Sequence, residues 1–363
     1  MKIATLKTTL VRLPVKPAIT TPLHHIASVE TVLVEIGTDT GLQGLSYLWC
    51  FGPQRARALE LLVHDLFGHV VGMQVHAREA VFARLWREMN FLGRTGAILI
   101  AASAIDTALW DLAGQEAGRP VWALLGGSGR PVKAYCGGFF LSESVDSIVA
   151  EANARVAQGF RAVKMRCGAA DWIEDIDRVA AIRDAVGPDV EILIDVVQGW
   201  DVPRALKVGR ALDRFDITYI EDPVAFDDLA GMARIAEALD IPLAAGENTY
   251  GRAGFRQLIE ARAIDVAMID LQRAGGISEW MKIAALVQAH GLPVVPHVFQ
   301  EISIHMLSAL PGAPFIEVMD WWTPLFVQKP QLRDGAYVPP RDPGLGLTLD
   351  RDAIEPLIVR ETT

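Results

Sequence analysis

Cysteine and long apolar runs are both scarce in this chain of 363 residues. The three cysteines, Cys50, Cys136 and Cys167, are odd in number and follow no framework spacing. This excludes a small disulfide-stabilised secreted domain and favours a reducing, cytoplasmic location. The most apolar stretch, Gly96 to Ile105, ends at Asp106 and is too short to span a bilayer. The start, Met-Lys-Ile-Ala-Thr-Leu-Lys, places a second lysine before any apolar run develops, so a secretory signal is not expected.

Positive charge is also in deficit. Lysine and arginine number 34 against 44 aspartates and glutamates, which gives a formal net charge of −10 at pH 7. Nucleic acids and anionic membranes attract basic surfaces, so neither is expected as a partner. The chain is 51% apolar, which is enough for a sizeable core, and its length suggests one large domain with an accessory one.

The apolar patterning divides the chain into three parts. Residues 1–125 are expected to form an N-terminal α+β cap, with strands at 2–13, 29–37 and 44–49 and helices at 52–68, 76–89 and 95–118. Residues 126–324 alternate between short apolar strands and amphipathic helices. Residues 325–363 are rich in proline and glycine and are expected to pack back onto the cap.

The middle part carries eight strand candidates, which are 132–136, 161–166, 191–196, 217–221, 242–246, 266–270, 293–297 and 315–319. Helical periodicity fills most of the gaps between them, which favours an α/β fold with a parallel sheet. Eight βα units predict a closed TIM-type barrel. The alternative is an open doubly wound sheet, which would normally carry a glycine fingerprint after its first strand, and Gly137-Gly138-Phe139-Phe140 is not one.

Charged residues recur where these apolar strands end. They are Lys164, Asp195, Glu221, Glu247, Asp270, His297 and Glu317. Buried parallel strands are apolar nearly throughout, so a charge found only at the strand end is not explained by solvation. The carboxyl ends of barrel strands converge on one face, and catalysis takes place there in barrel enzymes.

Three of these residues predict a metal site. Asp195, Glu221 and Glu247 end consecutive strands, and neighbouring strands lie only about 5 Å apart. Three carboxylates with room for water and substrate suit Mg²⁺. The alternative is that each caps a helix or pairs with a basic side chain. Zinc is not indicated, because His297, Glu301 and His305 lack the His-Glu-x-x-His spacing, and the last two are expected on the helix after the seventh strand.

Bases are expected on both sides of the metal. Lys164 and Arg166 share one face of their strand, while Asp270 beside His297 would fix the imidazole tautomer. Such a layout suits removal of the proton α to a carboxylate, since metal and lysine can stabilise the enolate as it forms. Glu317, if protonated, could donate a hydrogen bond to the same carboxylate. The alternatives are a core histidine bonded to backbone and a surface salt bridge for Lys164.

Together these segments resemble the enolase superfamily, in its mandelate racemase subgroup, for which a Lys or His base with Mg²⁺ is a known pattern. The resemblance rests on the helix Ser103 to Gly114 and on Gly159 to Lys164, Glu221-Asp222-Pro223, Gly246-Glu247-Asn248, Gly275-Gly276-Ile277 and His297 to Ser303. It implies an α+β cap over a modified (β/α)7β barrel, Mg²⁺ on the three carboxylates, an Asp270–His297 dyad and a homo-oligomer. Cap loops near 16–30 and 47–54 would close over the substrate, with Thr20, His24, His25, Trp49 and Phe51 as specificity candidates.

Two departures from the family pattern bear on the reaction. The family's Lys-x-Lys motif is Lys164-Met165-Arg166 here, and arginine holds its proton too firmly to act as a second base. Val197 stands where the family often has an asparagine that binds substrate, and valine cannot bind a hydroxyl. We therefore expect dehydration of a hydroxy acid, such as an acid sugar, to a 2-keto acid. Racemisation or cycloisomerisation is the alternative, and a non-catalytic ligand-binding barrel is a remote one.

Overall fold

The computed structural model describes residues 1–21, 25–139 and 141–362, and His24 lies outside this range. The cap is built on an antiparallel sheet with strand order β14-β1-β2-β3. Its strands are β1 (Ile3–Thr20), β2 (His25–Thr38), β3 (Gln43–Cys50) and β14 (Ile358–Thr362). Its helices are α1 (Pro53–Gly68), α2 (Arg78–Glu88), η1 (Met89–Phe91), α3 (Ala97–Ala117) and α4 (Val121–Leu124).

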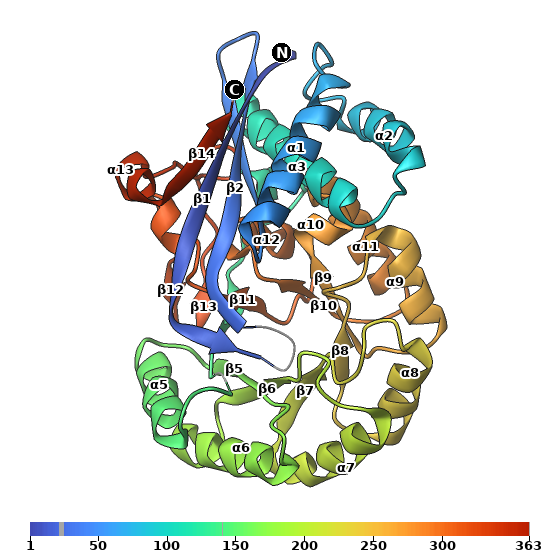
Figure 1. Cartoon of the computed structure of the whole chain (residues 1–363), viewed down its shortest axis with the longest axis vertical. Coiled ribbons are helices and arrows are strands. Elements are labelled where there is room, and N and C mark those ends of the chain that lie inside the picture. The colour runs from blue at the N-terminus through green and yellow to red at the C-terminus, as the bar shows by residue number, and fades with distance from the viewer. Residues whose placement is uncertain (22–24, 140, 363) are drawn as a thin grey trace.

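The first two strands are longer than the apolar pattern predicts. Strands were expected at 2–13 and 29–37, with a loop between them, but β1 continues to Thr20 and β2 begins at His25. Their register shifts between Pro14 and Ile19, because a proline has no N–H to donate to the ladder. Buried and exposed side chains still alternate in part beyond this irregularity. The two strands therefore form a long hairpin that reaches from the cap down to the barrel (Figure 1).

Helix α3 is the central helix of the cap. By length and composition it could cross a membrane, but 83% of its most apolar window is buried inside the fold, so it is a core helix. The apolar stretch ends at Asp106, but the helix continues past it to Ala117. That carboxylate is buried and accepts hydrogen bonds from Ser278 N (2.9 Å) and Ser278 Oγ (2.6 Å), which ties the cap to the barrel. Burial raises the pKa of Asp106 to about 6.

In the described part of the chain, eight parallel strands form the barrel, as predicted. They are β4 (Val132–Gly137), β5 (Ala162–Arg166), β6 (Glu191–Asp195), β7 (Ile217–Glu221), β8 (Leu243–Ala245), β9 (Val266–Asp270), β10 (Val294–His297) and β11 (Ile316–Val318). Strands β4 to β10 pair in sequence order, and β11 pairs with β4, which curls the sheet into a (β/α)7β barrel. The fold is thus a modified TIM barrel with an α+β cap.

Helices cover the outside of this barrel (Figure 1). They are α5 (Val145–Ala157), α6 (Trp172–Val186), α7 (Val202–Leu212), η2 (Asp213–Phe215), α8 (Leu229–Ala238), α9 (Gly251–Glu260), α10 (Leu271–Ala274), α11 (Ile277–Ala289) and α12 (Gln300–Ala309). Glu301 and His305 lie on α12, on the helix after the seventh strand, as expected.

The barrel interior explains where the charged residues point. A separate core cluster contains Tyr135, Ala162, Leu193, Tyr219, Ala244, Val266, Met268, Val295 and Phe315. Side chains two residues apart on a strand share a face. Lys164 follows Ala162, Asp195 follows Leu193, and Glu221 follows Tyr219 at this spacing. Asp270, His297 and Glu317 follow Met268, Val295 and Phe315 in the same way. The charged residues therefore continue the inward-facing rows at their carboxyl ends.

The C-terminal segment adds strands to both the barrel sheet and the cap sheet. After η3 (Thr323–Leu325), β12 (Leu332–Arg333) and β13 (Ala336–Tyr337) form a small hairpin whose second strand pairs with β4. The chain then runs through α13 (Arg351–Ile354) and η4 (Glu355–Leu357) to β14, which pairs with β1.

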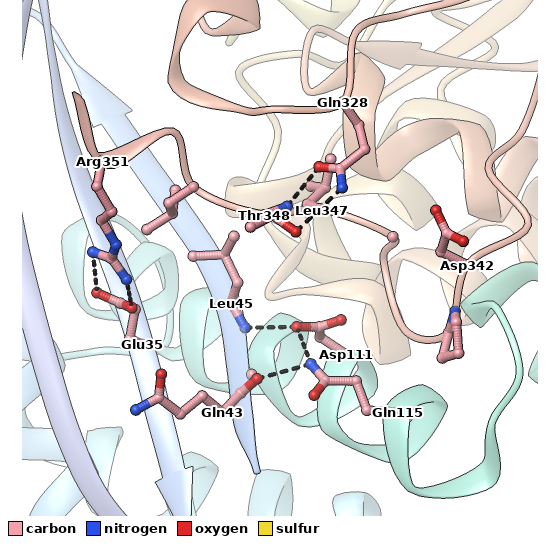
Figure 2. Close-up of a pocket in the computed structure, with 14 residues that line it drawn as sticks. Glu35, Gln43, Leu45, Asp111, Gln115, Gln328, Asp342, Leu347, Thr348 and Arg351 are labelled. Carbon is pink, nitrogen blue, oxygen red and sulfur yellow. Dashed lines mark hydrogen bonds and ion pairs between the residues drawn. The ribbon is translucent and has the colours of Figure 1, made fainter. Parts of the chain in front are cut away.

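A polar cavity of about 400 Å³ lies where this tail crosses the cap sheet and α3. Asp111 of α3 accepts hydrogen bonds from the backbone N–H groups of Leu345 and Leu45, both 2.7 Å, and from Gln115 Nε2. Figure 2 shows this junction, with the Arg351–Glu35 ion pair on the opposite wall. The same buried carboxylate thus joins cap strand, cap helix and tail.

His305 of α12 connects α4 with the C-terminal tail through hydrogen bonds to Trp122 and Leu345. Its protonation makes the stability of the fold depend on pH. The ring is fully buried, its Nδ1 accepts from Trp122 N (3.2 Å), and its Nε2 donates to Leu345 O (3.1 Å), so the neutral form is bound. Burial lowers its pKa to about 4. The unfolded chain takes up this proton near pH 6.5 and the folded chain only near pH 4. Protonation therefore favours unfolding over that window, by about 3 kcal/mol in total.

We expect His305→Gln to lower stability at pH 7 and to flatten its decline between pH 6.5 and pH 4. Urea midpoints measured at several pH values check this. His290→Gln, at an exposed position, is the control and should follow the wild type. An unchanged slope in the His305 variant would contradict the assignment.

Candidate active site

The three carboxylates predicted as metal ligands come together at the carboxyl ends of β6, β7 and β8. One oxygen each from Asp195, Glu221 and Glu247 lies within 4.8 Å of the other two. Gly246 allows the chain to turn sharply directly after β8. Its φ is +128°, and a Cβ there would lie 2.6 Å from the carbonyl oxygen of Met268. Glycine at this position therefore lets Glu247 join the other two carboxylates.

The electrostatics of this cluster fit a divalent cation. Burial and then the charge of Asp195 raise the pKa of Glu221 well above its ordinary value, because like charges in a dry site repel. Burial and Glu247 do the same to the pKa of Asp222, which follows Glu221. The donors are all oxygens, the ligand type that Mg²⁺ prefers. Asp195, Glu221 and Glu247 are thus the residues that would hold the ion.

Lys164 and Arg166 lie beside these carboxylates on β5. Lys164 is fully buried, with Nζ 2.6 Å from Glu317 Oε1, 3.1 Å from Glu221 Oε2 and 3.7 Å from Asp195 Oδ2. Burial opposes its charge, but Glu221 and Glu317 outweigh burial and raise its pKa. It is not the surface salt bridge considered as an alternative. Arg166 pairs with Asp195 and lines the cavity above, whereas Lys164 is not among the residues that line it.

His297 and Asp270 lie on neighbouring strands and form a close pair. Nδ1 of His297 is 2.7 Å from Asp270 Oδ2, and Nε2 is 3.2 Å from Glu247 Oε2. Burial opposes the positive charge on the ring, but Glu247 and Asp270 raise its pKa above the ordinary value. Since Asp270 accepts from Nδ1–H, Nε2 is the nitrogen that faces the carboxylate cluster. The ring lines the cavity and is not the backbone-bonded core histidine weighed as an alternative.

Arg273 holds Asp270 in place and was missed by sequence reasoning. Its side chain lies 3.4 Å from Asp270 Oδ2, and its backbone N–H donates to Asp270 Oδ1 at 2.8 Å, which caps the short helix α10. Burial opposes its charge, but Asp270 and Glu247 raise its pKa. Asp270 therefore pairs with a base and also caps a helix. Only the position of Arg273, three residues after a strand-end aspartate, could have signalled this role.

The structure does not support protonated Glu317 as a hydrogen-bond donor. Burial favours its neutral form, but Lys164 and His297 outweigh burial and lower its pKa to about 2. Its Oε1 pairs with Lys164, and its Oε2 accepts from Val298 N at 2.8 Å. Glu317 is therefore an ionised acceptor that holds Lys164 and the chain after β10.

A cavity of about 240 Å³ opens above these groups, between the barrel and the cap. Trp49 and Phe51 line it, as expected for the second cap segment, and Val197 lines it from the end of β6. Thr20 and His25 do not. Both are exposed, and Thr20 Oγ1 lies 3.2 Å from His25 Nδ1. Because β1 and β2 continue as strands, their neighbours Thr21 and Ile26 reach the cavity instead.

Further lining residues come from barrel loops that carry no charge signal. They are Gln198, Asn248, Gln272, Val298, Met319 and Trp321. Asn248 Nδ2 donates to Glu247 Oε1 at 3.0 Å and orients that carboxylate. Gln272 exchanges two 3.3 Å hydrogen bonds with the backbone of Trp49, which fastens the cap over the barrel. The Trp321-Trp322 pair, which follows the last barrel strand β11, is the sequence feature that could have indicated this part of the cavity lining.

The comparisons with known proteins agree with this geometry. Residues 3–126 match the N-terminal domain of the mandelate racemase / muconate lactonizing enzyme family, and residues 147–353 match the enolase C-terminal domain-like family. A 3,6-anhydro-alpha-L-galactonate cycloisomerase of Streptomyces coelicolor is 32% identical over 97% of this chain and 98% of its own.

Solved structures give the same result. An L-talarate dehydratase from Polaromonas sp. JS666, complexed with Mg and L-glucarate, has a TM-score of 0.94 at 30% identity and covers 99% of this chain and 98% of its own. An enolase from Bradyrhizobium, complexed with magnesium and mandelic acid, has a TM-score of 0.93 at 32% identity and covers 99% of each chain. The chain is an enzyme of the enolase superfamily and belongs to its mandelate racemase / muconate lactonizing enzyme family.

Proposed function

We propose that this enzyme removes the α-proton of a hydroxy acid, most favourably an acid sugar, and eliminates an oxygen leaving group from the next carbon to give a 2-keto acid. The observation that carries the proposal is one cavity holding a His297–Asp270 pair on one side and the Asp195–Glu221–Glu247 cluster on the other. The similar proteins named above are a dehydratase and a cycloisomerase, and both fit this chemistry.

Each residue has a role that its contacts suggest. Mg²⁺, when bound by the three carboxylates, supplies positive charge that lowers the energy of the negative charge developing on the substrate carboxylate. Nε2 of His297 accepts the α-proton, because Asp270 keeps the proton on Nδ1 and stabilises the imidazolium. His297 then returns the proton to the departing oxygen. Lys164 adds a buried positive charge beneath the site, and Arg166 clamps an anionic group.

Cycloisomerisation is the second candidate. If the leaving oxygen belongs to a ring, the same elimination opens the ring and no water is lost. The similarity to a cycloisomerase over nearly the full length of both chains favours this reading. Racemisation is disfavoured, because it needs a second base and Arg166 stands in that place with a raised pKa.

The test is a screen of the purified protein with Mg²⁺ against a library of acid sugars and their cyclic derivatives. We expect 2-keto acid formation, with mass spectrometry reporting loss of water or its retention. We also expect chelation to abolish turnover and Mg²⁺ to restore it. Exchange of the α-proton in D₂O without any elimination would instead indicate a racemase.

Arg166→Lys tests whether one base operates. A lysine at this position could accept a proton, which the guanidinium cannot do. We expect the variant to exchange the α-proton of the opposite-handed substrate in D₂O, followed by NMR, while the wild type does not. Arg333→Lys, at an exposed position, is the control. If the variant exchanges the α-proton no faster than the wild type, the argument that Arg166 is replaced by a usable base in this variant fails.

We also propose a cytoplasmic homo-oligomer that acts on a small carboxylate. The described cysteines are all free thiols, which suits a reducing compartment. Phe91, the last residue of η1, and Leu92, which follows it, are 99% and 68% exposed, and such an apolar surface suits contact with another copy. Light scattering after gel filtration tests the oligomer, and a monomer would contradict it.

A further inference from the structure

A second cavity lies at the other end of the barrel strands. It has a volume of about 790 Å³, compared with about 240 Å³ for the catalytic cavity. Its walls come from the α3–α4 junction, the loop before β4, the β12–β13 hairpin and the tail after β13. Because that loop leads into β4, the cavity lies at the amino end of this strand, whereas the catalytic groups lie at the carboxyl ends. The two cavities share no lining residue, so a molecule bound in one does not occupy the other.

Three arginines give this cavity an excess of positive charge. Arg119, Arg333 and Arg341 line it and are exposed, and Asp334 is the one acidic residue in the described lining. Within the described part of the chain none of the three guanidinium groups forms an ion pair, and that of Arg333 donates to Gln331 Oε1 at 3.0 Å. The whole chain has a formal charge of −10, so this local excess runs against its composition. Neighbouring cations repel one another, and an anion placed between them would offset that repulsion.

The excess is smaller on the other side of the tail. A neighbouring cavity of about 490 Å³ shares Arg333 and Arg341, and its lining also includes Lys329, Asp342 and Glu301. Three basic side chains are thus set against two acidic ones there, compared with three against one in the larger cavity. An anion is therefore attracted more strongly to the larger cavity.

Backbone hydrogen bonds fix the segments that carry these arginines. Gly344 N donates to Arg119 O at 3.0 Å, which ties the α3–α4 junction to the tail. Arg333 pairs with Ala336 in the β12–β13 hairpin, and β13 in turn pairs with β4 of the barrel. The fold therefore sets where these side chains start, so a ligand that binds them has less backbone freedom to remove than it would on a free loop.

Trp122 supplies an aromatic surface beside the arginines. Its Nε1 donates to Pro340 O at 2.7 Å, which also fixes the backbone next to Arg341. A Cβ on Gly129 would lie 2.9 Å from two carbons of the indole, so this loop packs directly on the ring. The indole is half-buried and lines the cavity together with Pro120, Pro131 and Pro339. Flat apolar groups of this kind attract a planar ring of a ligand.

We propose that this cavity binds a phosphorylated small molecule with a planar ring, the chemistry of a nucleoside diphosphate. The phosphate oxygens pair with Arg119, Arg333 and Arg341, because the guanidinium fork matches phosphate geometry. The ring packs on Trp122. A volume of about 790 Å³ is within the range of small-molecule sites. A nucleic acid fits less well, since the net charge of −10 repels a long polyanion. This site goes beyond the proposed reaction and does not depend on it.

The experiment measures binding of adenosine diphosphate (ADP), pyrophosphate and adenosine to the Mg²⁺-loaded protein by calorimetry. We expect one ADP per chain, bound at least about tenfold more tightly than pyrophosphate or adenosine, since only ADP has both the phosphates and the ring. Added salt should weaken ADP binding, because it screens charges at an exposed site. Absence of ADP binding, or adenosine that binds as tightly as ADP, would overturn the proposal. Pyrophosphate that binds as tightly as ADP would overturn the ring contact.

Arg119→Gln and Arg341→Gln locate the bound ADP. Each substitution keeps a long polar side chain but removes one charge, and each should weaken ADP binding about tenfold. Arg210→Gln, at an exposed position on α7, is the matched control and should bind ADP as the wild type does. Unchanged ADP affinity in both cavity variants would place the ligand elsewhere, such as at the catalytic metal, and would overturn the proposal.

Trp122→Leu and Trp122→Phe test the ring contact. Both lose the hydrogen bond to Pro340, but only phenylalanine keeps an aromatic surface. We expect the leucine variant to bind ADP no more tightly than pyrophosphate, and the phenylalanine variant to keep most of the preference for ADP. Tm values of both variants show whether the tail stays folded. Equal ADP affinities in the two variants would show that the ring of the ligand does not pack on Trp122.

Discussion

His297→Asn should reduce kcat by about 10²–10⁴-fold while leaving the fold intact, the range that a general base contributes. Asparagine can still occupy the space near Asp270, but it has no nitrogen able to accept the α-proton. The dyad distance of 2.7 Å and the second contact to Glu247 position the imidazole between the two acidic groups. The measurement is turnover of the substrate found in the screen, with α-proton exchange in D₂O as an independent readout.

Circular dichroism and Tm provide the structural check on this variant. His290→Asn, at an exposed site on the helix side of the barrel, is the matched control and should retain full activity. Normal exchange in His297→Asn would show that another group removes the proton, and the His297–Asp270 assignment would then be wrong.

Lys164→Met should have the second large effect, on both stability and rate. The ammonium group neutralises Glu221 and Glu317 inside the barrel, at 3.1 Å and 2.6 Å, and both carboxylates are fully buried. Removing one partner of a buried ion pair costs about 3–5 kcal/mol, because the charge left behind has no solvent. We also expect kcat to fall by about 10²–10³-fold, as for loss of a charge that stabilises the transition state.

Lys133→Met is the control for this substitution. Lys133 pairs with Glu191 on the same barrel, but both side chains are more than a third exposed. Exposed ion pairs contribute about 0–1 kcal/mol. Urea unfolding of the two variants, with and without Mg²⁺, should therefore differ by several kcal/mol. Equal losses would mean that burial of Lys164 does not govern its contribution.

The barrel and its charged ring could be predicted from sequence because both follow from local rules. Six inward rows of the barrel end in a charged residue two positions after a residue of the interior cluster, as at Leu193–Asp195 and Val295–His297. Parallel strands bring such ends together whatever the details of the helices outside. The positions of six of the charged side chains therefore follow from the strand assignment alone, whereas Glu247 also depends on the turn at Gly246.

The rest depends on contacts between distant segments. Glu317 is ionised because Lys164, far away in sequence, lies 2.6 Å from it, and no local pattern gives that distance. The β1–β2 hairpin is long because pairing continues past an irregularity at Pro14, which local apolar patterning cannot show. Arg273 and Gln272 act through Asp270 and Trp49, so their roles appear only in the assembled fold.

The cap sheet cannot be completed until the C-terminal strand β14 has been synthesised, because β14 pairs with β1. Strand β14 pairs with β1 through residues Thr8 to Val11, although some 350 residues separate the partners, as in the Thr8–Thr362 pair. The cap sheet therefore lacks its outer strand while the ribosome is still making the barrel. An exposed strand edge is a template for wrong pairing. Until β14 emerges, β1 offers that edge to other nascent chains, which makes this interval the point at which a chaperone would most affect yield.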